Sequence, residues 1–254
     1  MKKKAKASKK TSPKAPPPPP QQKEQLYEGK SKVLFATSDP QSLIVYFKDD
    51  ATAFNAQKRG TIVDKGIFNN DICTKIYGEL EKKGVATHLV RQLSPREQLV
   101  RKVEIIPIEV IVRNVVAGSL AKRLGVEEGR ELKVPSVEFC YKSDPLGDPF
   151  ISDDIAVGMG WATRKEMDYL HASAIKVNDF LKKYFAKLGI RLVDFKLEFG
   201  RFKGKILLAD EITPDGCRLW DAKTGEKLDK DRFRRDLGNV EGAYQRVHGA
   251  VMGA

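Results

Sequence analysis

The sequence from Ile190 to Glu211 is IRLVDFKLEFGRFKGKILLADE, and its pattern predicts a β-hairpin. Residues 192–199 alternate between apolar and polar side chains, which is the period of a half-buried strand. The alternation predicts an apolar face made of Val193, Phe195, Leu197 and Phe199. The opposite face would then carry Asp194, Lys196 and Glu198.

A second apolar run, residues 206–209, follows a turn that we expect to centre on Gly204. This turn would place Asp210 directly opposite Glu198, although two opposed carboxylates repel each other. A Mg²⁺ ion that also binds phosphate oxygens would favour such a pair, because hard cations take carboxylate oxygens. Lys196 would add positive charge where phosphate charge develops. The pattern fits a solvated polar face of an ordinary sheet equally well.

Composition narrows the class of protein. The chain has 254 residues and a net charge of +12, but residues 1–23 contain eight lysines and no acid, so the remainder carries only +4. A mildly basic body suits an enzyme of anionic substrates better than a protein that binds nucleic acid. No apolar run approaches the roughly 18 residues of a membrane span. The three cysteines are scattered and match no disulfide or zinc pattern, as in a reducing, cytoplasmic compartment.

The chain divides into a tail and two expected lobes. Residues 1–25 are rich in lysine and proline, and we expect a disordered tail there, because such a segment buries too little apolar area to fold. Residues 26–107 are expected to form an N-terminal nucleotide-binding lobe and residues 108–254 a C-terminal catalytic lobe. Pro107 is expected to interrupt a strand and to mark the join between them.

The start of the first lobe suggests a phosphate clamp. Residues 27–35 predict a strand, a glycine turn and a second strand. Lys30 and Lys32 are two apart and so face the same side, and Gly29 allows close approach of a ligand. Paired lysines are also common on ordinary surfaces. Residues 51–65 are expected to be irregular, followed by a helix to residue 83 that Asp64 caps.

The second lobe opens with a β-branched strand, residues 108–116. Ser119 is expected to cap a short helix after it, leaving backbone N–H groups for a phosphate. Arg113 would lie near this turn, and its guanidinium suits phosphate or carboxylate; a surface ion pair with Glu109 is the alternative. A capping box over residues 163–166 predicts a long helix over 164–188, and a final helix is expected over 240–252.

Four segments together resemble one family. They are IIPIEVIVRNVVAGS at residues 105–119, LVDFKLEFG at 192–200, DEITPDGCRLWD at 210–221 and DKDRFR at 229–234. These segments are similar to signatures of the SAICAR synthetase family, the phosphoribosylaminoimidazole-succinocarboxamide synthases, and the resemblance extends from about residue 26 to residue 247. The resemblance implies an α+β fold with two lobes, similar to ATP-grasp enzymes, with ATP in the cleft between them.

The resemblance also implies a reaction and a set of site residues. The family joins L-aspartate to the carboxylate of an aminoimidazole ribonucleotide (CAIR) through an acyl phosphate, using ATP and Mg²⁺ and giving SAICAR, ADP and phosphate in purine biosynthesis. By role, the residues that match are Lys30, Lys32, Ile105 and Ile106 for ATP, Glu198 and Asp210 for Mg²⁺, Arg113, Ser119, Arg218 and Arg234 for the ribonucleotide, and Asp194 and Lys196 beside the reacting carboxylate.

Two other functions remain open from the sequence. A small-molecule kinase would use the same hairpin and lysines, because any phosphoryl transfer needs them. A nucleic-acid-binding protein would act through the lysine-rich tail. As partners we expect CAIR and L-aspartate, no membrane and no specific nucleic acid, with a homodimer as one possibility.

Overall fold

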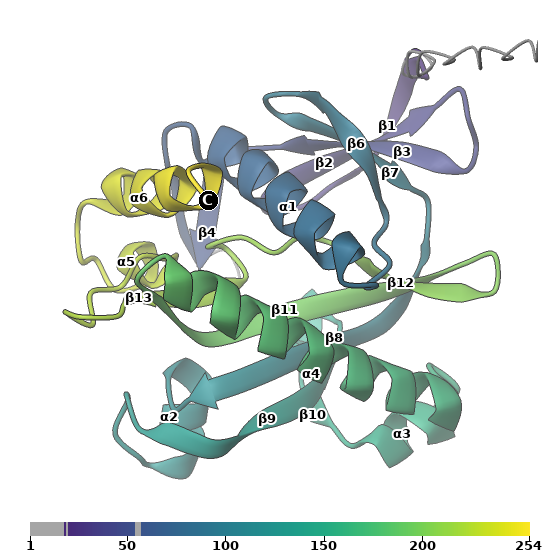
Figure 1. The fold of residues 1–254 in the computed structure, drawn as a ribbon. Helices are drawn as coiled ribbons and strands as arrows, with labels where there is room; N and C mark the ends of the chain where they lie inside the picture. Colours follow the sequence, from purple (N-terminus) through teal and green to yellow (C-terminus); the bar gives the residue numbers. More distant parts are fainter. Residues whose placement is uncertain (1–17, 19, 54–56) are drawn as a thin grey trace, which may run out of the picture.

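The computed structural model describes residues 18, 20–53 and 57–254. Two antiparallel sheets carry the fold, and they lie one above the other in Figure 1. The upper, N-terminal sheet has the strand order β1-β2-β3-β7-β6. Its strands are β1 (Gln22–Glu28), β2 (Lys32–Thr37), β3 (Ser42–Phe47), β6 (Leu89–Ser94) and β7 (Glu97–Arg101).

The lower, C-terminal sheet has the order β10-β9-β8-β11-β12, and β13 pairs with β11. Its strands are β8 (Glu104–Val115), β9 (Glu131–Tyr141), β10 (Phe150–Ile151), β11 (Ile190–Phe202), β12 (Lys205–Ala209) and β13 (Cys217–Asp221). A separate hairpin consists of β4 (Asp50–Ala53) and β5 (Lys58–Thr61).

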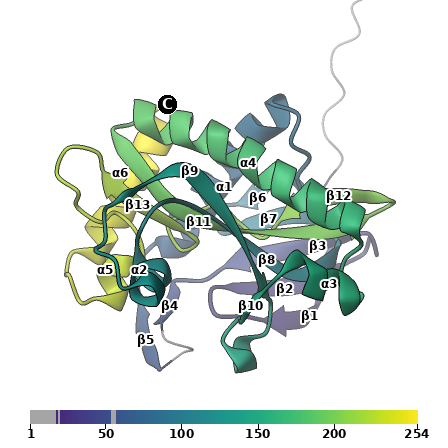
Figure 2. The same cartoon turned by 90° about the horizontal axis from the view of Figure 1, so that it is seen from below.

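Helices cover one side of each sheet. Helix α1 (Lys65–Lys82) packs on the N-terminal sheet beside α6 (Val240–Met252), and α4 (Arg164–Lys187) crosses the C-terminal sheet, as Figures 1 and 2 show from two directions. The shorter helices are α2 (Gly118–Leu124), η1 (Asp144–Leu146), α3 (Asp153–Gly158) and α5 (Asp231–Arg234). In the described part of the chain, no helix is both long and apolar enough to cross a bilayer.

One apolar core joins the two sheets. It contains Ile72 and Ile76 of α1, Leu170 and Leu181 of α4, and Phe195 of β11, all of which are almost inaccessible to water. The N-terminal sheet therefore shares its core with the C-terminal sheet on the side that α1 covers. Its other face has a separate apolar cluster, which includes Val45 and Val100, and this face is turned towards a cleft.

The predicted hairpin forms, with a different register from the one expected. Phe202 pairs with Lys205 across a two-residue turn, in which Lys203 (φ 49°) and Gly204 (φ 74°) are both left-handed. This is the backbone that a type I′ turn requires. Glu198 pairs with Ala209 and not with Asp210, so the prediction of directly opposed carboxylates was wrong by one residue.

The predicted alternation holds over only part of β11. The side chains of Phe195, Leu197 and Phe199 enter the main core as expected, whereas Val193 packs in a separate cluster. A register shift between Leu192 and Asp194 in the pairing with β13 explains the difference. Such a bulge adds a residue to one strand and reverses the side that the following side chains face.

Pro107 does not interrupt its strand. Strand β8 runs through it, and the switch between the two sheets lies at residues 102–103 instead. Pro107 falls where the pairing of β8 with β11 shifts its register, between Glu198 and Gly200. A proline is tolerated there because it lacks only an N–H that an irregular ladder does not use.

Other local predictions differ from the structure near the chain start. Strand β1 begins at Gln22, inside the segment expected to be a disordered tail, and its residues are all exposed. Residues 1–17 and 19 lie outside the described residues. The segment expected to be irregular, 51–65, contains most of the β4–β5 hairpin, and residues 54–56 of it are likewise outside the described part.

Of the three expected helix caps, one forms and two do not. The capping box forms in full, because Thr163 Oγ1 accepts from the Glu166 N–H while the Glu166 carboxylate accepts from the Thr163 N–H. Asp64 makes no side-chain cap to α1. Ser119 lies inside α2, whose N-cap is Ala117, so the prediction that Ser119 caps this helix was wrong.

Candidate active site

A cleft lies between the uncovered face of the N-terminal sheet and the C-terminal sheet. It encloses about 440 Å³ and combines apolar, basic and acidic walls. Its lining includes the predicted residues Lys30, Lys32, Ile105, Lys196, Glu198 and Asp210, together with Leu34, Leu43, Val45, His88, Val100, Glu109, Lys142, Asp144, Asp148 and Lys230. The two sheets therefore bring together residues that are up to 200 positions apart in the chain.

Lysines and carboxylates alternate at the base of this cleft. Lys196 Nζ is ion-paired with Glu198, lies 3.2 Å from Asp210 Oδ2 and lies 3.2 Å from Glu109 Oε1. Lys142 Nζ donates to the same Glu198 oxygen at 2.8 Å. The two carboxylates predicted to bind metal thus converge on one lysine, even though they are not opposed across the hairpin.

Lys32 closes this cluster from the N-terminal sheet. It is ion-paired with Asp210 and lies 3.0 Å from Glu211 Oε1. Burial disfavours its charged form, but the Asp210 and Glu211 carboxylates outweigh burial and raise the pKa of Lys32. Burial likewise opposes ionisation of Asp210, and Lys32 and Lys196 together still hold its pKa below the usual range. Both groups are therefore charged at neutral pH.

The carboxyl group of Glu109 differs from that of Asp210 in the direction of its pKa shift. Burial raises the pKa of Glu109, and Lys196 opposes this effect only in part. Glu109 is the cross-strand partner of Glu198, so two acidic side chains stand next to each other on neighbouring strands. Lysine ammonium groups hold this arrangement together in the structure, and a divalent cation could take the place of an ammonium group beside these carboxylates.

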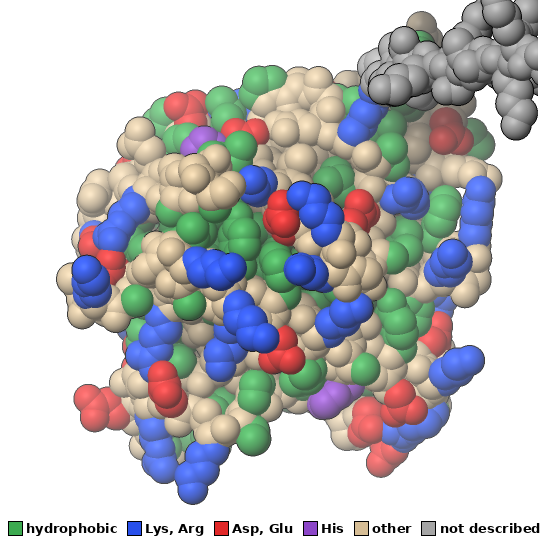
Figure 3. Space-filling view, viewed as in Figure 1, with side chains coloured by type: hydrophobic (Ala, Val, Ile, Leu, Met, Phe, Trp, Pro, Cys, Tyr) green, Lys and Arg blue, Asp and Glu red, His purple; other side chains and the backbone are tan. Residues whose placement is uncertain are grey.

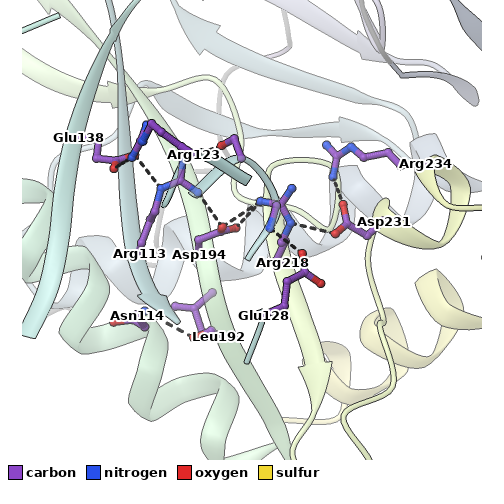
Figure 4. A network of polar contacts seen from close by, with 12 residues as sticks. Arg113, Asn114, Arg123, Glu128, Glu138, Leu192, Asp194, Arg218, Asp231 and Arg234 are labelled. Atoms are coloured by element: carbon purple, nitrogen blue, oxygen red, sulfur yellow. Dashed lines mark hydrogen bonds and ion pairs between the residues drawn. The ribbon is translucent and has the colours of Figure 1, made fainter. Parts of the chain in front are cut away.

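A network of arginines and carboxylates continues the site along β11 (Figure 4). Asp194 Oδ2 accepts from Arg113 Nη1 at 3.1 Å and from Arg218 Nη1 at 2.9 Å. Arg113 is only 2% exposed, and it also donates to Glu138 at 2.7 Å and to Ser119 Oγ at 3.1 Å. Burial raises the pKa of Asp194, and the two arginines oppose that rise. The alternative of a surface ion pair between Arg113 and Glu109 is wrong.

Asp231 links two of the predicted ribonucleotide residues. Its Oδ2 accepts from Arg218 Nε at 2.9 Å, and its Oδ1 accepts from Arg234 Nη1 at 2.7 Å (Figure 4). The four predicted ribonucleotide residues, Arg113, Ser119, Arg218 and Arg234, therefore form one connected group. They do not line the cleft itself, and Asp194 connects their group to Lys196 two residues further along the strand.

Gly118 makes room for this group. Its φ is +54°, and a Cβ atom added to it would lie 2.3 Å from Arg218 Nη2. Its N–H donates to Glu128 Oε1 at 2.8 Å, so the first amide of α2 is already engaged. A side chain at this position would collide with the guanidinium as well as strain the backbone.

The rim of the cleft carries a contact between the two sheets. Lys30, in the turn between β1 and β2, donates to Asp144 Oδ1 of η1 at 2.7 Å. Both side chains are exposed, so the contact is weak and easily exchanged. The predicted phosphate clamp therefore stands over the cleft, at a position where a polyphosphate could replace the carboxylate.

Of the four residues predicted to bind ATP, Ile106 is the one that does not line the cleft. Ile106 is fully buried in the shared core, while its neighbour Ile105 lines the cleft. Successive residues of a strand face opposite sides, so the two side chains point away from each other. The assignment of Ile105 and Ile106 to ATP stays a prediction.

Sequence reasoning missed several residues of the site. Glu109 was considered only as an ion-pair partner, and Lys142, His88, Glu211 and Asp231 were given no role. The position of Glu109 in the middle of β8, which pairs with β11, could have indicated it. The others depend on tertiary contacts, such as Lys142 Nζ with Glu198, that no local pattern contains.

The fold and site define a class of protein. A buried lysine–carboxylate cluster in a cleft between two sheets, next to a cluster of arginines, is typical of an enzyme that transfers or activates phosphoryl groups on anionic substrates. On the face shown in Figure 3, basic and acidic side chains are interspersed, which is not the single basic patch of a nucleic-acid-binding surface.

Comparison with known proteins identifies the family. The family model of SAICAR synthetase matches residues 25–251. A phosphoribosylaminoimidazole-succinocarboxamide synthase of Clostridium acetobutylicum is 58% identical over 231 residues, which are 91% of this chain and 98% of that protein. The one of Magnetococcus marinus is 62% identical over 227 residues, 88% and 94% of the two chains.

Solved structures agree with the sequences. The crystal structure of the corresponding synthase from Ehrlichia chaffeensis has a TM-score of 0.89 at 45% identity and covers 91% of this chain and 99% of its own. A SAICAR synthetase in complex with ADP has a TM-score of 0.88 at 46% identity, covering 91% and 98%. The chain therefore belongs to the SAICAR synthetase family, which are ligases of purine biosynthesis, and the α+β fold expected from the sequence is confirmed.

Proposed function

We propose that this chain binds ATP in the cleft and joins L-aspartate to the carboxylate of CAIR, giving SAICAR, ADP and phosphate. One observation carries the proposal: β11 presents Asp194, Lys196 and Glu198 in succession, with the arginine network at one end and the cleft at the other. A ribonucleotide phosphate at the arginines and a triphosphate in the cleft would then meet beside Lys196. The relative in complex with ADP supports a nucleotide in this fold.

The chemistry proceeds in two balanced steps. A carboxylate oxygen of CAIR attacks the γ-phosphorus of ATP, and the bond to the β–γ bridging oxygen breaks, giving an acyl phosphate and ADP. The free amine of L-aspartate then attacks the acyl carbon, the C–N bond forms, the nitrogen releases one proton to solvent, and phosphate leaves with the former carboxylate oxygen. No protein nucleophile is required, so catalysis consists of positioning and charge neutralisation.

Each part of the site has a proposed role in these steps. Lys30 and Lys32 hold the phosphates of ATP, and Ile105 contacts the adenine. Lys196 neutralises charge as it develops on the transferred phosphoryl group. It is well suited to this role because carboxylates raise its pKa well above the usual range against the effect of burial, so it stays protonated. Asp194 orients Arg113 and Arg218 towards the ribonucleotide.

The donor set also suits magnesium. Mg²⁺ in phosphoryl-transfer sites takes one or two protein carboxylates and fills its other positions with phosphate oxygens and water. Glu198 of β11 and Asp210, which directly follows β12, provide two such carboxylates, and both contact Lys196. Among the described residues no group of three or more acidic, histidine or cysteine side chains is placed to hold a metal ion by itself. The bound ion would neutralise phosphate charge.

The remaining expectations also stay proposals. We propose a nucleotide-binding lobe over residues 26–107 and a catalytic lobe over residues 108–254. The chain passes from the N-terminal sheet to the C-terminal sheet at residues 102–103, and the two sheets share a core. A homodimer in the cytoplasm is proposed as the working form. A tail from residue 1 to 25 is proposed to be dispensable for the reaction, although strand β1 begins within it at Gln22.

The test combines substrate dependence with a matched pair of variants. Formation of ADP by the full chain should require CAIR and L-aspartate together, and mass spectrometry should find the succinyl adduct. A stable phosphorylated product formed without aspartate would indicate a kinase instead. Lys196→Met should lower kcat by a factor on the order of 10² to 10³, the scale of a lost electrostatic contact.

The control is Lys205→Met, an exposed lysine of the same hairpin, which should leave kcat unchanged. Circular dichroism should show that both variants are folded. If Lys196→Met and Lys205→Met had the same kcat, the proposed role of the β11 cluster would be wrong.

A further inference from the structure

Lys230 is the lysine of the cleft whose side chain has no hydrogen-bonded partner within the described part of the chain. It lines the cleft and is 8% exposed, and Asp215 Oδ2 lies 4.0 Å from the Lys230 Nζ, which is too far for a hydrogen bond. The other lysines along the cleft each donate a hydrogen bond to a carboxylate; they are Lys30, Lys32, Lys142 and Lys196. The ammonium group of Lys230 therefore keeps its donors for a ligand.

The carboxylate nearest to Lys230 is already engaged by two other side chains. Asp215 Oδ2 accepts from Lys65 Nζ at 2.7 Å, and Asp215 Oδ1 accepts from the Tyr244 hydroxyl. Lys65 and Asp215 are almost inaccessible to water, and their charges balance each other. Lys230 thus adds a positive charge that this pair does not balance.

The surroundings of Lys230 favour binding of an anion. An ammonium group that is largely out of water and has no close partner is costly to the fold. Burial lowers the pKa of Lys230, and attraction to Asp215 opposes this effect only in part. A carboxylate that enters the cleft would supply the missing acceptors. It would also bind more strongly than at an exposed lysine, because less water remains to screen the two charges.

The backbone places Lys230 between the two parts of the proposed site. Its N–H donates to the Pro214 carbonyl at 3.1 Å, and the Gly216 carbonyl of the same turn accepts from the Lys196 N–H at 3.0 Å. The next residue in the chain, Asp231, belongs to the arginine network. Lys230 therefore stands between the end of β11 that carries Lys196 and the proposed site of the ribonucleotide.

The amino-acid substrate is the one that still lacks a binding residue. The proposed roles assign Lys30 and Lys32 to the triphosphate and the arginine network to the phosphate of CAIR. L-Aspartate carries two carboxylates, and each of them needs a charged donor once it leaves water. The amine has to reach the acyl carbon between the ribonucleotide and the triphosphate, which is where Lys230 stands.

We propose that Lys230 binds a carboxylate of L-aspartate through its ammonium group and thereby holds the attacking amine beside the acyl carbon. The inference rests on the proposed reaction and adds to it a residue for the amino-acid substrate. In this role Lys230 is a binding residue, and it exchanges no proton during the reaction.

The test replaces the ammonium group without shortening the side chain. Lys230→Met should raise KM for L-aspartate about 30-fold, the scale of one lost hydrogen bond between charged groups. KM for ATP and KM for CAIR should stay unchanged. Lys230→Arg keeps a charged donor, so its KM for L-aspartate should lie between those of the unaltered chain and Lys230→Met. The Tm of Lys230→Met should not fall, because this ammonium group has no hydrogen bond to lose within the described part of the chain.

The matched control is Lys223→Met, an exposed lysine of the same C-terminal segment, which should leave all three KM values unchanged. An unchanged KM for L-aspartate in folded Lys230→Met would refute the proposal. A rise confined to CAIR or ATP, or an equal rise for all three substrates, would refute it as well. If turnover of a variant is too slow, calorimetric titration of L-aspartate in the presence of ADP and CAIR gives the same comparison. Failure of the unaltered chain to form ADP with all three substrates would contradict the proposed function itself, so the two failures are distinguishable.

Discussion

Replacing Gly118 with alanine tests whether Arg218 needs the space beside α2 to hold the ribonucleotide. The added Cβ atom would lie 2.3 Å from Arg218 Nη2, 2.6 Å from Cζ and 2.9 Å from Nη1, closer than real Cβ contacts allow. The guanidinium must therefore move. It would leave Asp194, to which it donates at 2.9 and 3.1 Å, and Asp231, to which it donates at 2.9 Å.

The expected size of the effect follows from these contacts. A hydrogen bond that involves a charged group contributes about 2 kcal/mol, so loss of the contact of Arg218 with the ribonucleotide should raise KM for CAIR roughly 30-fold. The left-handed backbone adds about 1 kcal/mol of strain for alanine. For a chain of this size that strain lowers Tm by about 2–4 °C. KM for ATP should not change, because Gly118 does not line the cleft.

Gly125→Ala is the matched control. Gly125 ends the same helix with a similar φ of +64°, but nothing lies within 4 Å of an added Cβ. This variant should show the loss in Tm without the rise in KM for CAIR. Steady-state kinetics with CAIR varied, together with thermal unfolding of both variants, makes the comparison. The same KM for CAIR in both variants would refute the reasoning about Arg218.

Three further predictions concern the support of the site, pH and the tail. Tyr77→Phe removes the hydroxyl that donates to the Ala209 carbonyl at 2.7 Å, and urea unfolding should show a loss of about 1–2 kcal/mol; no loss would contradict the importance of this bond. A hydrogen bond from Arg201 lowers the pKa of Glu166 from 4.5 to about 2. The ionised Glu166 carboxylate therefore contributes fully to the stability of the fold above pH 4.5, and this contribution is lost as the pH falls towards 2. The free energy of unfolding, measured with urea, should fall less between pH 5 and pH 3 for Glu166→Gln than for the unaltered chain. Equal decreases in the two proteins would count against this assignment. Deletion of residues 1–17 should leave kcat and KM unchanged, and loss of turnover would give the tail a role in the reaction.

Local patterns predicted much of the fold for identifiable physical reasons. The capping box at Thr163 and the glycine turn of the β11–β12 hairpin are signals that few alternative structures share, and both are present, the turn with a register shifted by one residue. The register of the hairpin was missed because it depends on whether Lys203 and Gly204 both adopt a left-handed backbone, as they do here, or Gly204 alone does so. The bulge near Val193 was missed because β13 imposes it from outside the strand.

The sequence predicts those residues of the site that the alternation of side chains along one strand places together. It does not predict those that contacts between distant parts of the chain bring in. Asp194, Lys196 and Glu198 follow from the period of β11 alone. The arrangement of Lys142 and Lys32 around them depends on two other strands, whose approach has no local signal.

The most direct test of the proposed reaction follows the oxygen atoms. CAIR labelled with heavy oxygen in both carboxylate positions is converted with ATP and L-aspartate, and the released phosphate is analysed by mass spectrometry. The acyl-phosphate route, in which residues around Lys196 activate the carboxylate, predicts one labelled oxygen in each phosphate. Unlabelled phosphate would contradict that route and with it the assignment of the cluster on β11.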